Sequence, residues 1–114
     1  MRLRISVVDY APEELYEQLP LEAELVREIP GSDRPDYWIA RLVAPVLWRG
    51  GDTDTLVTHL VLCARWQGTA IEAGMHDLPV GIAYVRDSSV LEDKLLDFGK
   101  CAYVAIGIAE DVGA

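Results

Sequence analysis

The sequence predicts an α+β domain in which two or three short helices pack on one face of a mainly antiparallel sheet of about five strands. Two observations lead to this fold class. Strand-like segments follow one another between residues 37 and 67 with no helix between them, whereas helical spacing of apolar residues occurs near both ends of the chain. A chain of 114 residues, 51% of them hydrophobic, has room for one core, so we expect a single domain over residues 1–114.

The first part of the chain predicts one strand and two short helices. Apolar and polar residues alternate over residues 2–10, which is the period of a half-buried strand. Pro12 suits the first position of a helix, in which Leu15 and Leu19 lie four residues apart on one face. Pro20 cannot continue this helix without losing a backbone bond, so either the chain kinks there or a second short helix begins over residues 21–28 (LEAELVRE).

The middle of the chain predicts a hairpin. Every even position from Trp38 to Trp48 is apolar, and Pro45 places this strand at a sheet edge or at a bulge because proline cannot donate to a ladder. The glycines and aspartates of residues 49–54 indicate the hairpin loop. Residues 56–66 are apolar at nearly every position, which is typical of a central strand covered on both faces.

The last part of the chain predicts a strand over residues 80–85, a helix, and a final strand over residues 101–108. Small residues in the final strand, Ala105 and Gly107, favour close packing of a helix against it. The preceding helix has a capping box, apolar residues at helical spacing and a terminal glycine, which are Ser89 with Glu92, then Leu91, Leu95 and Phe98, then Gly99.

The chain is acidic, with a formal net charge of −9 and a sequence pI of about 4.5. Residues 1–36 carry nine acids against four bases and residues 87–114 carry six against two, whereas residues 37–86 are neutral. Nucleic acid and anionic membranes would be repelled, so neither is an expected partner. The sequence shows no apolar run that could span a membrane and no signal-peptide core, which predicts a cytoplasmic protein.

The surplus carboxylates are the candidate binding residues. Glu13 and Glu17 lie one predicted helical turn apart, as do Asp93 and Asp97, an arrangement that costs stability. Solubility alone would account for surplus acid, but acidic faces also speed the capture of a cationic partner. The predicted partner-binding set is Glu13, Glu14, Glu17, Glu24, Glu28, Asp33, Asp36, Asp93 and Asp97.

In size, acidity and architecture the chain resembles the small acidic inhibitors and toxin-neutralising immunity proteins that bacteria make. The resemblance implies a non-enzymatic protein that neutralises a basic toxin or enzyme by occupying its cationic surface, without catalytic residues, cofactor or metal. Eight arginines against two lysines are typical of a GC-rich bacterial source.

Two alternatives follow from other residues. A small enzyme or ligand-binding domain would use a pocket around His76, Asp77 and His59, because a carboxylate beside a histidine can orient it as a base. A homodimer would pair through the apolar strand from Trp38 to Trp48, since an exposed strand edge invites pairing.

The remaining chemistry-bearing residues indicate no site by their spacing. Cys63 and Cys101 lie in apolar runs and are expected to be small buried side chains. The spacing of cysteines and histidines that a zinc site requires is absent, and Asp52 and Asp54 lack further oxygen ligands for a hard cation.

Overall fold

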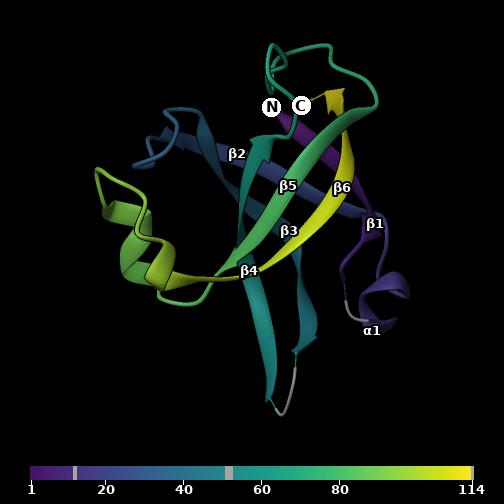
Figure 1. The fold of residues 1–114 in the computed structure, drawn as a ribbon. Helices are drawn as coiled ribbons and strands as arrows, with labels where there is room; N and C mark the ends of the chain where they lie inside the picture. Colours follow the sequence, from purple (N-terminus) through teal and green to yellow (C-terminus); the bar gives the residue numbers. More distant parts are fainter. Residues whose placement is uncertain (12, 51–52, 114) are drawn as a thin grey trace.

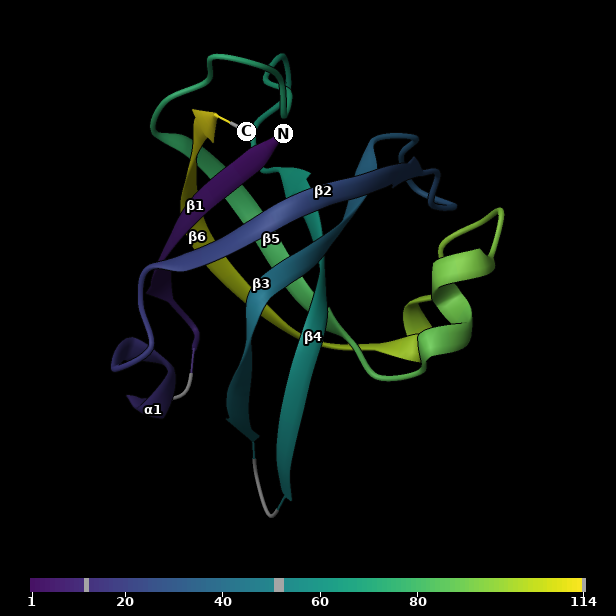
Figure 2. The ribbon, with the colours of Figure 1, turned by 180° about the vertical axis from the view of Figure 1, so that it is seen from behind.

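A computed structural model shows that the chain forms a closed barrel of six antiparallel strands (Figures 1 and 2). It describes residues 1–11, 13–50 and 53–113, and among these no helix is long and apolar enough to cross a membrane. The strands are β1 (Arg2–Asp9), β2 (Leu21–Ile29), β3 (Tyr37–Gly50), β4 (Thr53–Ala64), β5 (Leu78–Val85) and β6 (Cys101–Gly113). The helical segments are α1 (Glu13–Tyr16), η1 (Ser88–Glu92) and η2 (Phe98–Lys100).

The barrel closes because the first strand pairs with the last. Each strand pairs with the next one along the chain, and β1 completes the wall by pairing with β6, with Leu3 opposite Asp111 and Ile5 opposite Ala109. The predicted α+β fold is therefore wrong. The apolar faces of the strands turn towards one another and bury themselves inside the closed sheet, so no layer of helices is needed to cover them.

The barrel interior is filled with side chains. Trp48 is fully buried, and its ring lies 5.3 Å from that of Tyr84 between centroids. Small residues balance these bulky groups, as is typical of narrow barrels. Other members of this core include Leu3, Ile5, Leu21, Ala23, Ala40, Leu42, Val57, Leu60, Leu62, Val80, Ile82, Ala105 and Ala109.

The helix predicted for residues 21–28 is strand β2. Its leucines lie four residues apart, as in a helix, but Leu21 and Ala23 are also buried alternately with less buried neighbours. Antiparallel pairing with both β1 and β3 satisfies the backbone hydrogen bonds of this segment. The segment therefore forms a strand, although the spacing of its apolar residues also fits a helix. The helix before it is only the four residues of α1, and Pro12 lies outside the described residues.

The helix predicted after Ser89 is also wrong. Two short 3₁₀ helices take its place, and Asp87, not Ser89, caps the first of them. The predicted apolar face is not the buried one, since Leu95 and Phe98 are about half exposed while Val90 and Leu96 are buried. Asp93 and Asp97 therefore do not lie on one helix, because they flank the separate 3₁₀ segments.

The strand predictions in the middle of the chain are confirmed. β3 and β4 form an antiparallel hairpin, and the register shift between Arg41 and Val46 contains Pro45, as expected for a proline at a bulge. Beyond Leu42 the hairpin extends past the barrel wall beside α1 (Figure 1). There the Gln18 amide donates to the Leu47 carbonyl at 2.8 Å and accepts from its N–H at 2.9 Å, which closes that edge locally.

The small residues of β6 face the barrel interior, where Gly107 lies against strands β1 and β5 and not against a helix of the described chain. A Cβ atom at Gly107 would lie 2.8 Å from both the Ile82 Cδ1 atom and the Ser6 backbone oxygen. The close approach of β1 to β6 therefore requires glycine at this position.

We predict that Gly107→Ala lowers the free energy of unfolding by about 1–3 kcal/mol, because one of the clashing atoms is backbone and cannot rotate away. The control is Gly81→Ala, whose Cβ would meet only the Cys63 sulfur, at 3.2 Å. Urea denaturation of both variants measures the difference between their free energies of unfolding. Equal losses of stability would contradict the requirement for glycine at position 107.

Candidate binding site

A second apolar cluster lies outside the barrel wall. Strand alternation directs Tyr37 and Ile39 of β3 and Val61 of β4 outward, and all three are buried. Ile29 at the end of β2 joins them. The segment of residues 86–100 covers this outward strip and contributes Val90 and Leu96.

Hydrogen bonds hold this covering segment in place at its base and along its length. The Lys100 carbonyl accepts from the N–H groups of Arg86 and Asp87, at 2.8 and 3.1 Å. The Leu96 N–H donates to the Pro30 carbonyl at 2.7 Å. Arg27 of β2 donates to the carbonyls of Leu91 and Asp93. The cover is thereby closed at its own base and fastened to the end of β2 and the residue that follows it.

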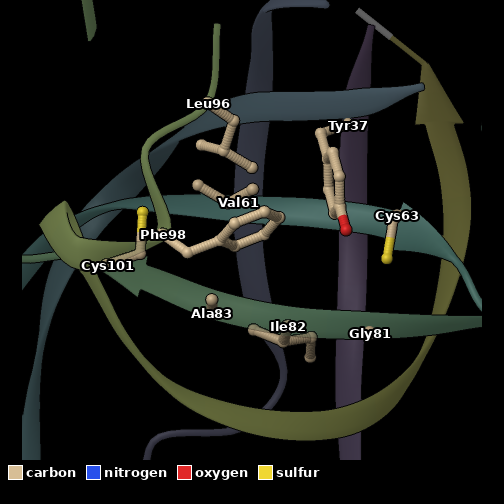
Figure 3. Close-up of a pocket in the computed structure, with 9 residues that line it drawn as sticks. All are labelled: Tyr37, Val61, Cys63, Gly81, Ile82, Ala83, Leu96, Phe98 and Cys101. Atoms are coloured by element: carbon tan, nitrogen blue, oxygen red, sulfur yellow. The ribbon is translucent and has the colours of Figure 1, made fainter. Parts of the chain in front are cut away.

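Between the cover and the wall lies a pocket of about 150 Å³ (Figure 3). Phe98 stands at its centre, with Tyr37 on one side and Cys101 on the other, and β5 runs below (Figure 3). Apolar protein cavities of this volume bind ligands such as benzene, so the space suits one ring or one branched side chain. The lining residues are Tyr37, Val61, Cys63, Gly81, Ile82, Ala83, Leu96, Phe98 and Cys101.

Tyr37 contributes a hydroxyl group to the lining of the pocket. Its hydroxyl points towards the Cys63 end (Figure 3) and donates to the Asp33 carboxylate at 2.7 Å, while its ring packs edge-on against Phe98 with 5.5 Å between centroids. Burial and the Asp33 carboxylate raise the pKa of Tyr37 well above its ordinary value. Gly31 makes room for the ring, because a Cβ there would lie 2.5 Å from Tyr37.

The two cysteines line opposite ends of the pocket (Figure 3). Cys63 pairs with Gly81 on one side of β5, and Cys101 pairs with Val85 on its other side, so the ends are separated by roughly 13 Å along β5 and by the step from β4 to β6 across it. That separation is too large for a disulfide or a shared metal. Burial raises the pKa of both thiols, so they are neutral near pH 7 and poor nucleophiles.

Each end of the pocket carries a carboxylate without a cationic partner among the described residues. At the Cys63 end, Arg34 binds both oxygens of Asp36, at 2.6 and 2.7 Å, while Asp33 accepts only from the neutral Tyr37. The neighbouring Arg34 holds the pKa of Asp36 below its usual range.

The Cys101 end repeats this arrangement with different residues. Lys100 binds Asp93 at 2.7 Å, while the Asp97 carboxylate accepts the N–H of Gly99 and forms no ion pair among the described residues. Asp33 is held near the Cys63 end by its bond to the Tyr37 hydroxyl, which points that way (Figure 3). Asp97 caps η2 directly before Phe98 of the pocket lining, and after burial it also raises the pKa of Cys101.

The predicted partner-binding residues divide between two sides of the barrel. Glu13 and Glu17 are exposed at α1, which lies on the opposite side from η1 and η2 in both views (Figures 1 and 2). The side chain of Glu14 lies outside the described residues. Asp33, Asp36, Asp93 and Asp97 gather around the pocket, and Glu28 is exposed near the end of β2.

Glu24 belongs to neither group. It sits on the wall of the barrel, where it bridges Arg2 at 3.0 Å and Arg41 at 2.9 Å. These two arginines lower the pKa of Glu24. Its charge is therefore already compensated by neighbouring strands.

His59, His76 and Asp77, which were predicted to line a pocket of an enzyme or ligand-binding domain, lie on different elements of the fold. His59 lies on β4 opposite Arg41, and the hollow beside it is lined by neither His76 nor Asp77. Burial, assisted by Arg41, lowers the pKa of His59. His76 and Asp77 occupy the exposed loop before β5. Among the described residues no group of three or more His, Cys, Asp or Glu side chains could hold a metal, and Asp52 and the Asp54 side chain lie outside them.

β3, the strand proposed for a homodimer, already pairs with neighbouring strands over part of its length. Residues 38–41 of β3 pair on both sides, with β2 and with β4. Past Leu42 no pairing with β2 is present, and Gln18 occupies the backbone of Leu47. Any homodimer through β3 would have to use this outer part of the strand.

Sequence reasoning missed the pocket itself. Tyr37, Leu96 and Phe98 come from two segments far apart in the chain, and only the register of the strands brings them together. One signal was present: the apolar character of residues 56–66 on both faces predicts a cover outside the sheet, and Leu60, Val61 and Leu62 are indeed all buried. Comparison with protein-family models, with curated proteins and with solved structures finds no match to this chain.

We predict that Cys101 alkylates slowly at pH 7 and that its reaction rate keeps rising beyond pH 9, because burial and Asp97 disfavour the thiolate. The measurement is the rate of iodoacetamide labelling against pH in Cys63→Ala, where Cys101 alone reacts. Asp97→Asn keeps an acceptor for the Gly99 N–H and should shift this profile towards lower pH. An unchanged profile would contradict the placement of Asp97 beside the thiol.

Proposed function

We propose that the protein is a non-enzymatic acidic binding protein of the inhibitor or immunity type, which acts in the cytoplasm and neutralises a basic toxin or enzyme by occupying its cationic surface. The observation that carries the proposal is how the charges pair. Five basic side chains of the described chain form ion pairs within the molecule, as in Arg4 with Glu22 and Glu110. Carboxylates on both sides of the barrel, Glu13, Glu17, Asp33 and Asp97 among them, are left without an ion-pair partner among the described residues.

The shape of the molecule supports binding through its outer surface. Side chains fill the barrel interior, so a macromolecular partner must contact the wall, the loops or the covering segment. The pocket under that segment combines an apolar hollow with half-exposed Phe98, which is the kind of anchor point that protein interfaces use. Uncompensated carboxylates around an apolar anchor suit a partner of opposite charge.

The two groups of carboxylates would contribute differently. Those near the pocket border an anchor and would be contact residues. Glu13 and Glu17 lie on the other side of the barrel and would act at longer range, by attracting the partner before contact.

The immobilised full-length chain should retain a basic protein from a bacterial lysate at low salt. With that protein purified, we expect its association rate to fall by about tenfold or more between 0.05 and 0.5 M NaCl, because salt screens long-range attraction. Surface plasmon resonance measures the rate.

Glu13→Lys with Glu17→Lys should slow association at least about threefold at low salt while changing dissociation less. Tyr10→Phe, an exposed change at the same end of the molecule, alters no charge and should leave both rates as they are. Retention of no basic protein, or association that ignores both salt and charge reversal, would refute the proposed function.

A further inference from the structure

We propose that the pocket under residues 86–100 receives one bulky apolar side chain from an extended segment of the partner, in which the residues two before and two after it are Lys or Arg. This inference rests on the proposed function and names the kind of segment that the site takes. Three features of the pocket lead to it: its size, its two charged ends and the distance between them.

The size and lining of the pocket indicate which central side chain of the partner segment it accepts. A volume of about 150 Å³ accommodates a single ring or a branched aliphatic group, and the walls are contributed by Val61, Ala83, Leu96 and Phe98. The polar groups at its edge are engaged or neutral, since the Tyr37 hydroxyl is bonded to Asp33 and the thiols are protonated. An apolar side chain would thus leave no polar atom of the pocket newly unpaired.

The charged ends select the flanking residues. Asp33 at one end and Asp97 at the other have no cationic partner among the described residues, while the nearest cations, Arg34 and Lys100, are occupied by Asp36 and Asp93. A cation brought to either end by the ligand meets a carboxylate that is not yet neutralised. An acidic or neutral segment would gain no such contact.

The distance between the ends selects the spacing. The ends are separated by four residue steps along β5, roughly 13 Å. In an extended segment, the residues two before and two after a given position are also four steps apart, and they point to the same side as the central residue. An extended basic-x-apolar-x-basic segment therefore spreads its three side chains over the same length that separates the two ends of the pocket along β5.

The test is titration of the full-length, isotope-labelled protein with the acetylated, amidated peptide Lys-Thr-Phe-Thr-Lys, followed by NMR. We expect shifts centred on the amides of Tyr37, Ala83 and Phe98. Replacing the central Phe of the peptide by Gly should weaken binding about tenfold or more, through the lost burial of its ring. Glu-Thr-Phe-Thr-Glu should bind more weakly than Lys-Thr-Phe-Thr-Lys by a similar factor.

Variants of the protein separate the pocket from its charges. Ala83→Phe fills the hollow from its floor and should abolish binding, whereas Val43→Phe, which adds the same ring at an exposed site on β3, should not. Should Ala83→Phe fail to fold, Phe98→Ala removes the central wall and should likewise weaken binding. Asp33→Asn with Asp97→Asn keeps the acceptor oxygens and should weaken the lysine peptide but not Ser-Thr-Phe-Thr-Ser.

Shifts centred on α1, equal affinity for the glutamate and lysine peptides, no binding of the lysine peptide, or normal binding to Ala83→Phe would each overturn the inference. Its failure is distinguishable from failure of the proposed function. Salt-sensitive binding of a basic protein that persists in Ala83→Phe would leave the function standing and remove the pocket from it. Peptide binding without any retained basic protein would do the reverse.

Discussion

The pairing of β1 with β6 is the constraint on which the rest of the structure depends. It turns an open meander into a closed wall, and a closed wall of six strands encloses only enough space for side chains. This confinement accounts for the mixture of Trp48 and Tyr84 with alanines and Gly107 inside the barrel. It also means that whatever the protein binds must be met on the outside.

Closure of the barrel does not bury every apolar residue of its strands. β3 and β4 carry apolar side chains on their outer faces as well, and Ile39 and Val61 would be exposed on a bare barrel. The segment between β5 and β6 solves this by folding back over them. Leu95 and Phe98 of this segment stay about half exposed, so it covers the strip incompletely, and the pocket is the part left open.

The sequence predicted local structure where one periodicity was unambiguous. The hairpin of β3 and β4, the bulge at Pro45 and the doubly covered strand β4 all follow from patterns within single segments. Residues 21–28 satisfied both the helical and the strand period, and only pairing with neighbours decided between them. The pocket depends on which strands are adjacent and in what register, and that information is distributed over the whole chain. Asp33 and Asp97 were candidates from charge alone, and that they bind a partner stays a prediction.

The N–H groups of Arg86 and Asp87 both donate to the Lys100 carbonyl, and this closed base has an evolutionary consequence. The excursion between these points leaves the wall and rejoins it at nearly the same place, so its length and composition are decoupled from the geometry of the strands. Selection can therefore change the residues between these two points while the barrel that carries them stays the same.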